Sequence, residues 1–250
     1  LNVTTEVAAE LGKGPVRVVF YDEEAIQYQT EDYVPRVANR DDVELEWYCL
    51  PVQHRNGCSH KEPYWWPWAP EAEEKWVRPM PPEAITELEG FAMNPPSQRL
   101  SLPDSAGLLF PPERWGNVAL VMGIRAQESI MRTRAVLAKS QESFVIPWTD
   151  GTSRGNIWKV YPIYDWATDD VWRAPSQFGW DYNRSYDIME MAGISRMAQR
   201  CAPPYGEQPM QGLHNFKVAF PELWDKMAYR VEGAQAAARY SKTDLYEAAA

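Results

Sequence analysis

The sequence has 250 residues, of which 45% are hydrophobic and 24% charged, and this composition excludes a disordered or fibrous chain. The length suits one large domain or two small ones. The net charge of −10 argues against a protein that coats nucleic acid, although Arg125, Arg132 and Arg134 could form a local basic patch.

The three cysteines, Cys49, Cys58 and Cys201, are odd in number and lie far apart. They do not suggest a disulfide framework, and they favour a reducing, cytoplasmic location. The sequence contains no apolar run of 18 residues and does not open with a signal-peptide pattern, so we expect no membrane span.

Apolar residues at helical spacing, Val3, Val7 and Leu11, predict that the chain opens inside a helix. Gly12 and Pro15 then predict the end of that helix. The first residue is Leu and not Met, so we expect that further residues precede it in the complete protein.

The next segments predict a βαβ unit. Residues 16–21 are β-branched and aromatic, which indicates a buried strand, and residues 25–38 have a helical pattern. Residues 43–50 form a second strand candidate, so we expect a parallel pair of strands. Residues 1–50 would thus begin a nucleotide-binding α/β domain.

Periodicity fails between residues 51 and 112, where prolines interrupt any long helix or central strand. We interpret this segment as an insertion that forms a lid or wall. Its tryptophan-rich run, from Trp65 to Trp68, could stack on a base, but core packing for an irregular loop is the favoured interpretation.

From residue 113 to residue 250 the α/β alternation resumes. Buried strands are expected at 117–122 and 157–161. Helices are expected at 127–139, at 168–172 with Thr168 as the N-cap, at 181–192 and at 221–240. The complete pattern predicts an open, mainly parallel sheet with helices on both faces.

The segment after the strand at 117–122 could bind an anion. Gly123 would let the backbone approach a ligand, and the following helix would offer free N–H groups. Arg125 and Arg132 could grip phosphate or sulfate from two directions. The alternative is an ordinary strand-to-helix turn with solvated arginines.

This segment reads Gly-x-Arg-x-x-Glu-Ser-x-x-Arg and is similar to the motif of phosphoadenosine phosphosulfate (PAPS) reductases and of the small, ATP-binding subunit of ATP sulfurylase. Residues 161–172 resemble the family's Pro-(apolar)₂-Asp-Trp-x-x-x-Asp-Val-Trp signature. Residues 19–22 resemble its second strand, which ends in Asp.

The resemblance implies an adenine nucleotide α-hydrolase-like fold of the PP-loop superfamily, with ATP or PAPS as the ligand. It assigns nucleotide or anion binding to Asp22, Gly123, Ile124, Arg125, Glu128, Ser129, Arg132 and Asp165. Asp22 would lie near the nucleotide, with Mg²⁺ as a candidate bridging ion. Glu23 and Glu24 are interpreted as structural acids at the start of a helix.

Residues 56–65, 76–78 and 201–208 resemble a particular branch, the IbrA-like or DUF3440-type relatives. That branch is associated with regulation and with ParB-like partners. A non-catalytic nucleotide-binding regulator is therefore the alternative to an enzyme, and an oligomer is compatible with either.

Two features depart from the reductase pattern. The superfamily's pyrophosphate-binding loop, Ser-Gly-Gly-Lys-Asp-Ser, would lie before residue 1, because the chain opens in the helix that follows it. The reductase motif Glu-Cys-Gly-(apolar)-His is also lacking, and Gly212-Leu213-His214 has no cysteine. We therefore expect adenylation by an ATP pyrophosphatase or sulfur transfer, with the first favoured.

Cys58 and His60 lie two positions apart, and both residue types bind zinc or hold iron–sulfur clusters. The spacing does not match a standard site, so no metal site is assigned. A catalytic thiol at Cys58 would need His60 or Lys61 nearby, and one at Cys201 would need Arg200. A buried free thiol is the simpler interpretation.

Overall fold

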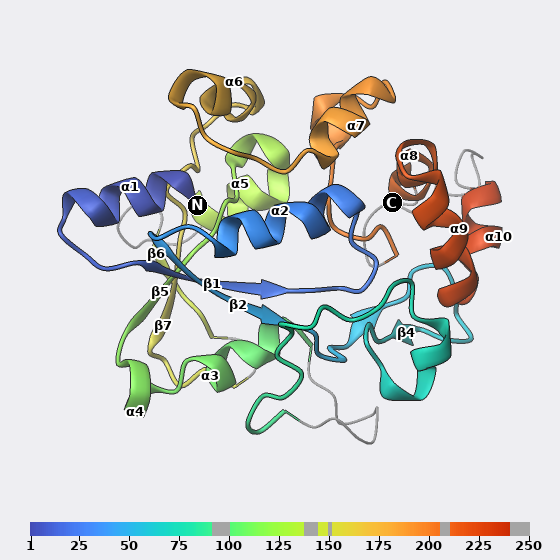
Figure 1. Ribbon diagram of the computed structural model, residues 1–250, viewed down its shortest axis with the longest axis horizontal. Coiled ribbons are helices and arrows are strands. Elements are labelled where there is room, and N and C mark those ends of the chain that lie inside the picture. The colour runs from blue at the N-terminus through green and yellow to red at the C-terminus, as the bar shows by residue number, and fades with distance from the viewer. Residues whose placement is uncertain (92–100, 138–144, 150–151, 206–210, 241–250) are drawn as a thin grey trace. The chain divides into compact units, whose positions relative to one another are not determined.

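The computed structural model describes residues 1–91, 101–137, 145–149, 152–205 and 211–240 (Figure 1). These residues form two compact units. The first unit comprises the described residues among 1–4, 88–92 and 100–182, and the second comprises those among 5–87 and 183–250. The insertion expected at 51–112 thus contributes to both units.

Regular elements in the first half of the chain are short. In chain order they are α1 (Asn2–Glu10), β1 (Val16–Tyr21), α2 (Tyr28–Ala38), β2 (Val43–Tyr48), β3 (His54–Arg55), β4 (Tyr64–Trp65), the 3₁₀ turns η1 (Pro70–Lys75) and η3 (Pro103–Ser105), α3 (Ala106–Leu109) and α4 (Pro112–Trp115).

The second half of the chain contains the remaining elements. The elements there are β5 (Val118–Val121), η4 (Ala126–Glu128), α5 (Ile130–Leu137), β6 (Val145–Pro147), β7 (Ile157–Val160), α6 (Thr168–Phe178), α7 (Ser185–Met191), η5 (Arg196–Ala198), α8 (Gln211–Ala219), α9 (Pro221–Arg230) and α10 (Ala234–Tyr240).

Strands β1 and β2 confirm the predicted βαβ unit. They pair in parallel, with Val16 opposite Val43 and Tyr21 opposite Tyr48, and α2 packs against β2 (Figure 1). The expectation of a buried β1 is wrong, because every residue of β1 is partly exposed. Among the described strands only β2 hydrogen-bonds to β1. The apolar residues of β1 therefore belong to a strand at the edge of a small sheet, where they stay partly exposed.

The first unit contains a sheet of order β5-β7-β6, in which β7 is parallel to β5 and antiparallel to β6. The strand expected at 117–122 is present but is not buried, because its residues alternate in exposure and Val121 is 45% exposed. Alternation of this kind is typical of an edge strand with one solvated face. Residues 138–144, which include the predicted end of the helix after β5, lie outside the described residues.

Two helix predictions need correction. Thr168 is the first residue of α6 and not its N-cap: Ala167 holds that position, and its N–H donates to Asp170 Oδ2 at 2.8 Å. The helix expected at 221–240 is two helices, α9 and α10, broken before Gly233 at φ +82°. A Cβ at Gly233 would lie 2.3 Å from the Cys58 carbonyl oxygen, so the break follows from close backbone contact.

The described architecture is therefore mixed α/β with small sheets. It does not contain the single extended parallel sheet that the alternation predicts: the described strands form pairs β1–β2 and β3–β4 and the three-stranded sheet. Short apolar runs in a sequence predict where strands lie, but they do not predict how many of those strands pair within one sheet.

A large hydrophobic core among the described residues lies in the second unit, where helices α8, α9 and α10 pack together (Figure 1). Tyr205 and Leu213 are fully buried there. Trp65 and Trp68 are also buried, which confirms the core interpretation of these two side chains.

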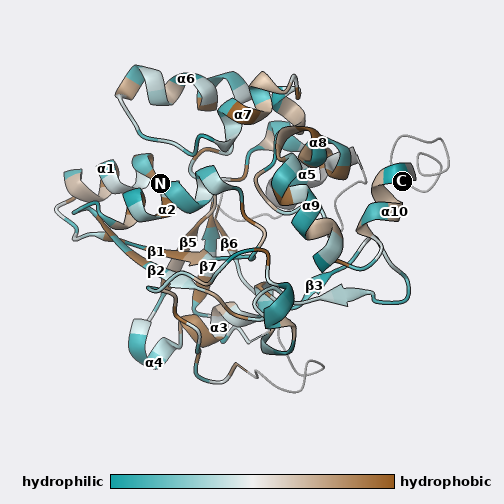
Figure 2. Ribbon diagram, turned by 45° about the vertical axis from the view of Figure 1, so that its right-hand side comes forward, coloured by the Kyte–Doolittle hydropathy of each residue, from teal (hydrophilic) through white to brown (hydrophobic). Residues whose placement is uncertain are grey.

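Figure 2 shows hydrophilic and hydrophobic residues side by side along α6, as expected for a helix with one packed face. None of the described helices is long and apolar enough to cross a membrane.

Candidate functional site

The predicted anion-binding segment lies at the carboxyl edge of the β5–β7 pair, within the first unit. Because these strands are parallel, the segments that follow them leave the sheet at the same edge. The Ala126 N–H donates to the Tyr164 carbonyl oxygen at 2.9 Å. The Thr168 N–H and hydroxyl donate to Gln127 Oε1 at 2.6 and 3.0 Å. Two of the three segments of the resemblance are thus brought together.

Glu128 connects the two arginines of this segment. Arg125 Nε lies 3.5 Å from Glu128 Oε1, and Arg132 Nε lies 3.1 Å from Glu128 Oε2. Arg125 Nη1 also donates to Thr168 Oγ1 at 3.2 Å and to the Trp166 carbonyl oxygen at 3.4 Å. Sequence reasoning expected both guanidinium groups to face a ligand, whereas in the structure one carboxylate orients both.

Arg132 is the more accessible of the two cations. Its side chain is 39% exposed, against 11% for Arg125 and 18% for Glu128. Two guanidinium groups and one carboxylate leave a net charge of +1 on this trio. Burial raises the pKa of Tyr161, and the positive charge of Arg132 works in the opposite direction. The edge therefore offers positive charge to solvent mainly through Arg132.

The other predicted residues of this edge have varied surroundings. Gly123 is exposed, and a Cβ there would meet nothing within 4 Å, so open space lies beside it. Ile124 packs against the buried cluster of this unit, which makes its side chain structural. Ser129 Oγ accepts the Arg132 N–H at 3.2 Å, as a helix-capping hydroxyl does, and Asp165 is exposed.

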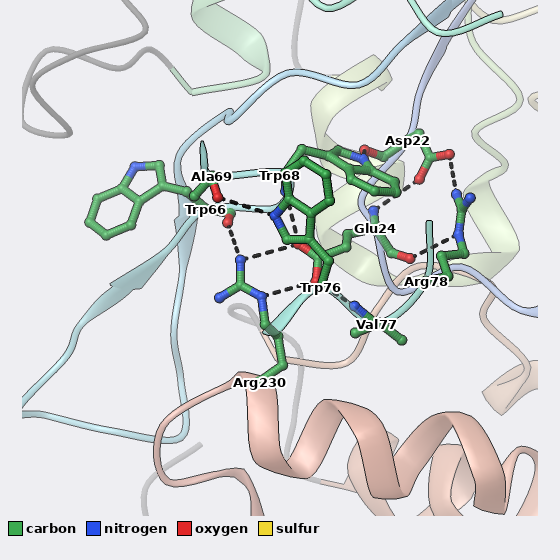
Figure 3. Close-up of polar contacts among 9 residues, drawn as sticks. All are labelled: Asp22, Glu24, Trp66, Trp68, Ala69, Trp76, Val77, Arg78 and Arg230. Atoms are coloured by element: carbon green, nitrogen blue, oxygen red, sulfur yellow. Dashed lines mark hydrogen bonds and ion pairs between the residues drawn. The ribbon is translucent and has the colours of Figure 1, made fainter. Parts of the chain in front are cut away.

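A second polar cluster lies in the other unit, where β1 ends (Figure 3). Asp22 Oδ1 accepts the Glu24 N–H at 2.9 Å, and Asp22 Oδ2 accepts Trp47 Nε1 at 2.8 Å and a hydrogen bond from Arg78 Nη2. The side chain of Asp22 is wholly buried and that of Arg78 is 3% exposed. Both carboxylate oxygens of Asp22 are thus occupied by protein donors.

The carboxylate of Glu24 accepts further hydrogen bonds of this cluster. It accepts the N–H groups of Trp68 and Val77 at 2.8 and 3.1 Å. Arg230 adds a bidentate pair, with Nε 2.9 Å from Oε1 and Nη2 3.1 Å from Oε2 (Figure 3). Glu24 itself has φ +63°, an uncommon conformation for a residue with a side chain. The cluster balances two buried carboxylates with two guanidinium groups and joins β1, the insertion and α9.

These contacts bear on the predicted role of Asp22. A Mg²⁺ ion bound through this carboxylate would have to displace the Glu24 N–H from Oδ1, or Trp47 or Arg78 from Oδ2, so the donor set does not fit a metal site. Nucleotide binding by Asp22 stays a prediction. Glu24 is structural as expected, but through ion pairing and not through a helix dipole, because α2 begins only at Tyr28.

Sequence reasoning missed Arg78 and Arg230. Arg78 lies in the Trp-Val-Arg segment that carries the branch resemblance, and that was the available signal. Arg230 ends α9, and no local pattern links it to an acid at the other end of the chain.

Glu23 and His54 form an unusual neighbouring pair beside this cluster. His54 Nε2 lies 3.8 Å from Glu23 Oε1 and is buried without a hydrogen-bond partner. Burial, with a smaller contribution from the charge of Asp22, raises the pKa of Glu23 to about 7. Burial lowers the pKa of His54 to about 4. Near neutral pH His54 is therefore uncharged and Glu23 is partly protonated.

The thiols do not have the surroundings of nucleophiles. Burial raises the pKa of Cys58 and of Cys201 to about 11. Burial also raises the pKa of Cys49, which is 1% exposed. At neutral pH all three are neutral thiols, which favours free cysteines, buried at Cys49 and partly buried at Cys58 and Cys201, over a catalytic role for Cys58 or Cys201. Within the described parts of the chain, no three Cys, His, Asp or Glu side chains converge as a metal site would require.

Comparison with known proteins adds two findings. Residues 193–247 match a family described as a domain of unknown function, DUF3440. The chain is also similar to an uncharacterized protein of Escherichia coli K12, YbdN, with 32% identity over 250 residues. The match covers 98% of this chain and 60% of YbdN, so the chain spans about 60% of that relative's length. The DUF3440 likeness predicted from residues 201–208 is thus confirmed, and the likeness to PAPS reductases stays a prediction.

Proposed function

We propose that the protein binds the anionic end of an adenine nucleotide, ATP or PAPS, at the carboxyl end of β5. The carrying observation is the Arg125–Glu128–Arg132 trio, fixed at that edge by hydrogen bonds to the segment after β7. Ligands of open α/β sheets bind at this edge, and guanidinium groups match phosphate and sulfate oxygens bidentately.

Each member of the trio has a separate role in this proposal. Arg132 is the contact to the anion, since its side chain is the most exposed of the three. Arg125 is a positioning residue that ties the turn to Thr168. Glu128 is also a positioning residue: its two oxygens hold the Nε atoms and leave the outer Nη atoms of Arg132 for a ligand.

For the chemistry, adenylation is favoured over reduction of PAPS. In adenylation an acceptor oxygen attacks Pα of ATP, the bond from Pα to the bridging oxygen breaks, and pyrophosphate leaves. That step needs no thiol. Reduction of PAPS needs a reactive thiolate, and burial keeps Cys58 and Cys201 protonated.

Isothermal titration of the full-length protein with ATP and with PAPS tests the binding site. Arg132→Ala should weaken binding about tenfold or more, because a charge-assisted contact is lost. Arg134→Ala is the matched control: it removes an exposed arginine of the same helix and should leave the affinity unchanged. Equal affinities for the wild type and both variants would contradict the proposal.

Product analysis of the same mixtures then separates the chemistries. Release of pyrophosphate would support adenylation, and release of sulfite would support sulfur transfer. Binding without either product, alone and with a ParB-like protein added, would favour the alternative of a nucleotide-binding regulator.

A further inference from the structure

A cavity of about 310 Å³ opens on the β3–β4 hairpin of the second unit, and the function proposed above does not involve it. Seven residues between Arg55 and Tyr64 line it, and none of these described residues is a carboxylate. Arg55, Ser59, His60 and Tyr64 provide its polar and aromatic groups.

The pairing of the two strands explains why Arg55 and Tyr64 face outward. Arg55 lies opposite Tyr64, and His54 lies opposite Trp65, in antiparallel register. Successive residues of a strand point to opposite faces. Trp65 is buried and its ring lies 5.5 Å from that of His54, so this pair faces the core. Arg55 and Tyr64 consequently share the solvent face.

The loop between the strands is held in place from behind. Buried Asn56 donates through Nδ2 to the Glu232 carbonyl oxygen at 3.0 Å and accepts the Cys58 N–H at 2.9 Å. The Gly57 N–H donates to the Tyr205 carbonyl oxygen at 2.7 Å. The cavity is therefore preformed, and a ligand would not have to order the loop.

Ser59 is oriented as a donor. Its Oγ accepts the N–H groups of Lys61 and Glu62, each at 3.2 Å. With its lone pairs engaged, the hydroxyl hydrogen is available to an acceptor. A guanidinium group, a hydroxyl hydrogen and an imidazole that line one hollow are donors of the kind that bind a tetrahedral oxyanion.

We propose that this cavity binds a small aromatic phosphate or sulfate ester, with the oxyanion at Arg55, Ser59 and His60 and the ring on Tyr64. Tyr64 is 39% exposed, so its ring offers a face for stacking. The cavity volume suits a small ester and not a macromolecule. The site belongs to the second unit, so it stands or falls independently of nucleotide binding at β5.

NMR titration of the ¹⁵N-labelled full chain with four probes tests this inference: inorganic phosphate, phenyl phosphate, phenyl sulfate and benzyl alcohol. Saturable shifts should centre on the amides of Gly57, Ser59 and His60. Phenyl phosphate should bind at least several-fold more tightly than phosphate alone, because stacking adds to the ionic contact, and benzyl alcohol should bind least. The two esters distinguish a phosphate ligand from a sulfate ligand.

Two variants assign the contacts. Arg55→Gln should weaken phenyl phosphate about tenfold or more. Tyr64→Leu should weaken phenyl phosphate but not inorganic phosphate. Arg36→Gln is the matched control, since Arg36 is exposed on α2, pairs with Asp32 and does not line the cavity. Shifts that do not saturate, that spread over the surface, or that persist unchanged in Arg55→Gln would overturn the proposal. If one variant does not fold, the order of affinities of the four probes for the wild-type protein still tests it.

Discussion

Arg230 and Glu24 form a bidentate ion pair across 206 positions of the sequence, with Nε 2.9 Å from Oε1 and Nη2 3.1 Å from Oε2. The pair is almost entirely buried, since Arg230 is 8% exposed and Glu24 is not exposed. It attaches the end of α9 to the loop that follows β1. Burying two charges is costly unless each is fully paired, so the pair specifies one arrangement of these segments.

Arg230→Ala should therefore destabilise the second unit strongly. It leaves the buried Glu24 carboxylate with backbone donors alone, and breaking a buried pair costs about 3–5 kcal/mol. Urea denaturation followed by tryptophan fluorescence measures the change. Arg196→Ala removes an exposed pair with Glu190 and should cost less than about 1 kcal/mol. Similar losses for both variants would show that the buried pair does not fix the fold.

The pKa of Glu23 makes stability depend on pH. Its pKa is about 7 in the folded protein against 4.5 for the ordinary group, so the folded state binds the proton more tightly. This contribution is complete below pH 4.5 and is lost as the pH rises through 7. Glu23→Gln should raise the free energy of unfolding by about 3 kcal/mol at pH 8 and change it little at pH 4. Chemical denaturation at both pH values provides the test, and an equal effect at both would exclude a titrating Glu23.

His54 should show the opposite dependence. Its pKa is about 4 in the folded protein against 6.5 for the ordinary group, so the unfolded state binds the proton more tightly. Stability is then lost as the pH falls from 6.5 to 4. His54→Phe keeps a ring against Trp65 but cannot bind a proton. The free energy of unfolding of this variant minus that of the wild type should therefore be about 2 kcal/mol larger at pH 5 than at pH 8. A difference that does not change with pH would mean that His54 titrates normally.

The thiols provide a direct test of the choice between chemistries. With pKa values of about 11, Cys58 and Cys201 should react with iodoacetamide at pH 7 far more slowly than an unperturbed cysteine. Mass spectrometry of the native protein, with the urea-unfolded protein as the control, locates the modified residues. Rapid modification of either thiol in the native protein would restore sulfur transfer as the favoured chemistry.

Local patterns in the sequence located most elements. The apolar spacing at residues 16–21 and 43–50 predicted β1, β2 and their parallel pairing. Residues 25–38 predicted α2, which begins at Tyr28 because Ala25 and the residues after Glu24 pass through a buried loop. In the same way, residues 117–122 and 157–161 predicted β5 and β7.

Long-range relationships could not be predicted in this way. An apolar strand sequence does not reveal how many neighbours cover it, so β1 and β5 were expected to be buried although both are partly exposed. Arg125 and Arg132 were identified, but their shared partner Glu128 was expected to bind the ligand. The Glu24–Arg230 pair depends on folding that brings distant segments together, and no sequence spacing encodes it.

Hydrogen exchange of the full-length protein with and without saturating ATP tests directly whether an adenine nucleotide binds at the carboxyl end of β5. If it does, ATP should slow exchange at the amides of residues 123–130, and this protection should be lost in Arg132→Ala but not in Arg134→Ala. Protection confined to other segments, or equal protection in both variants, would contradict it.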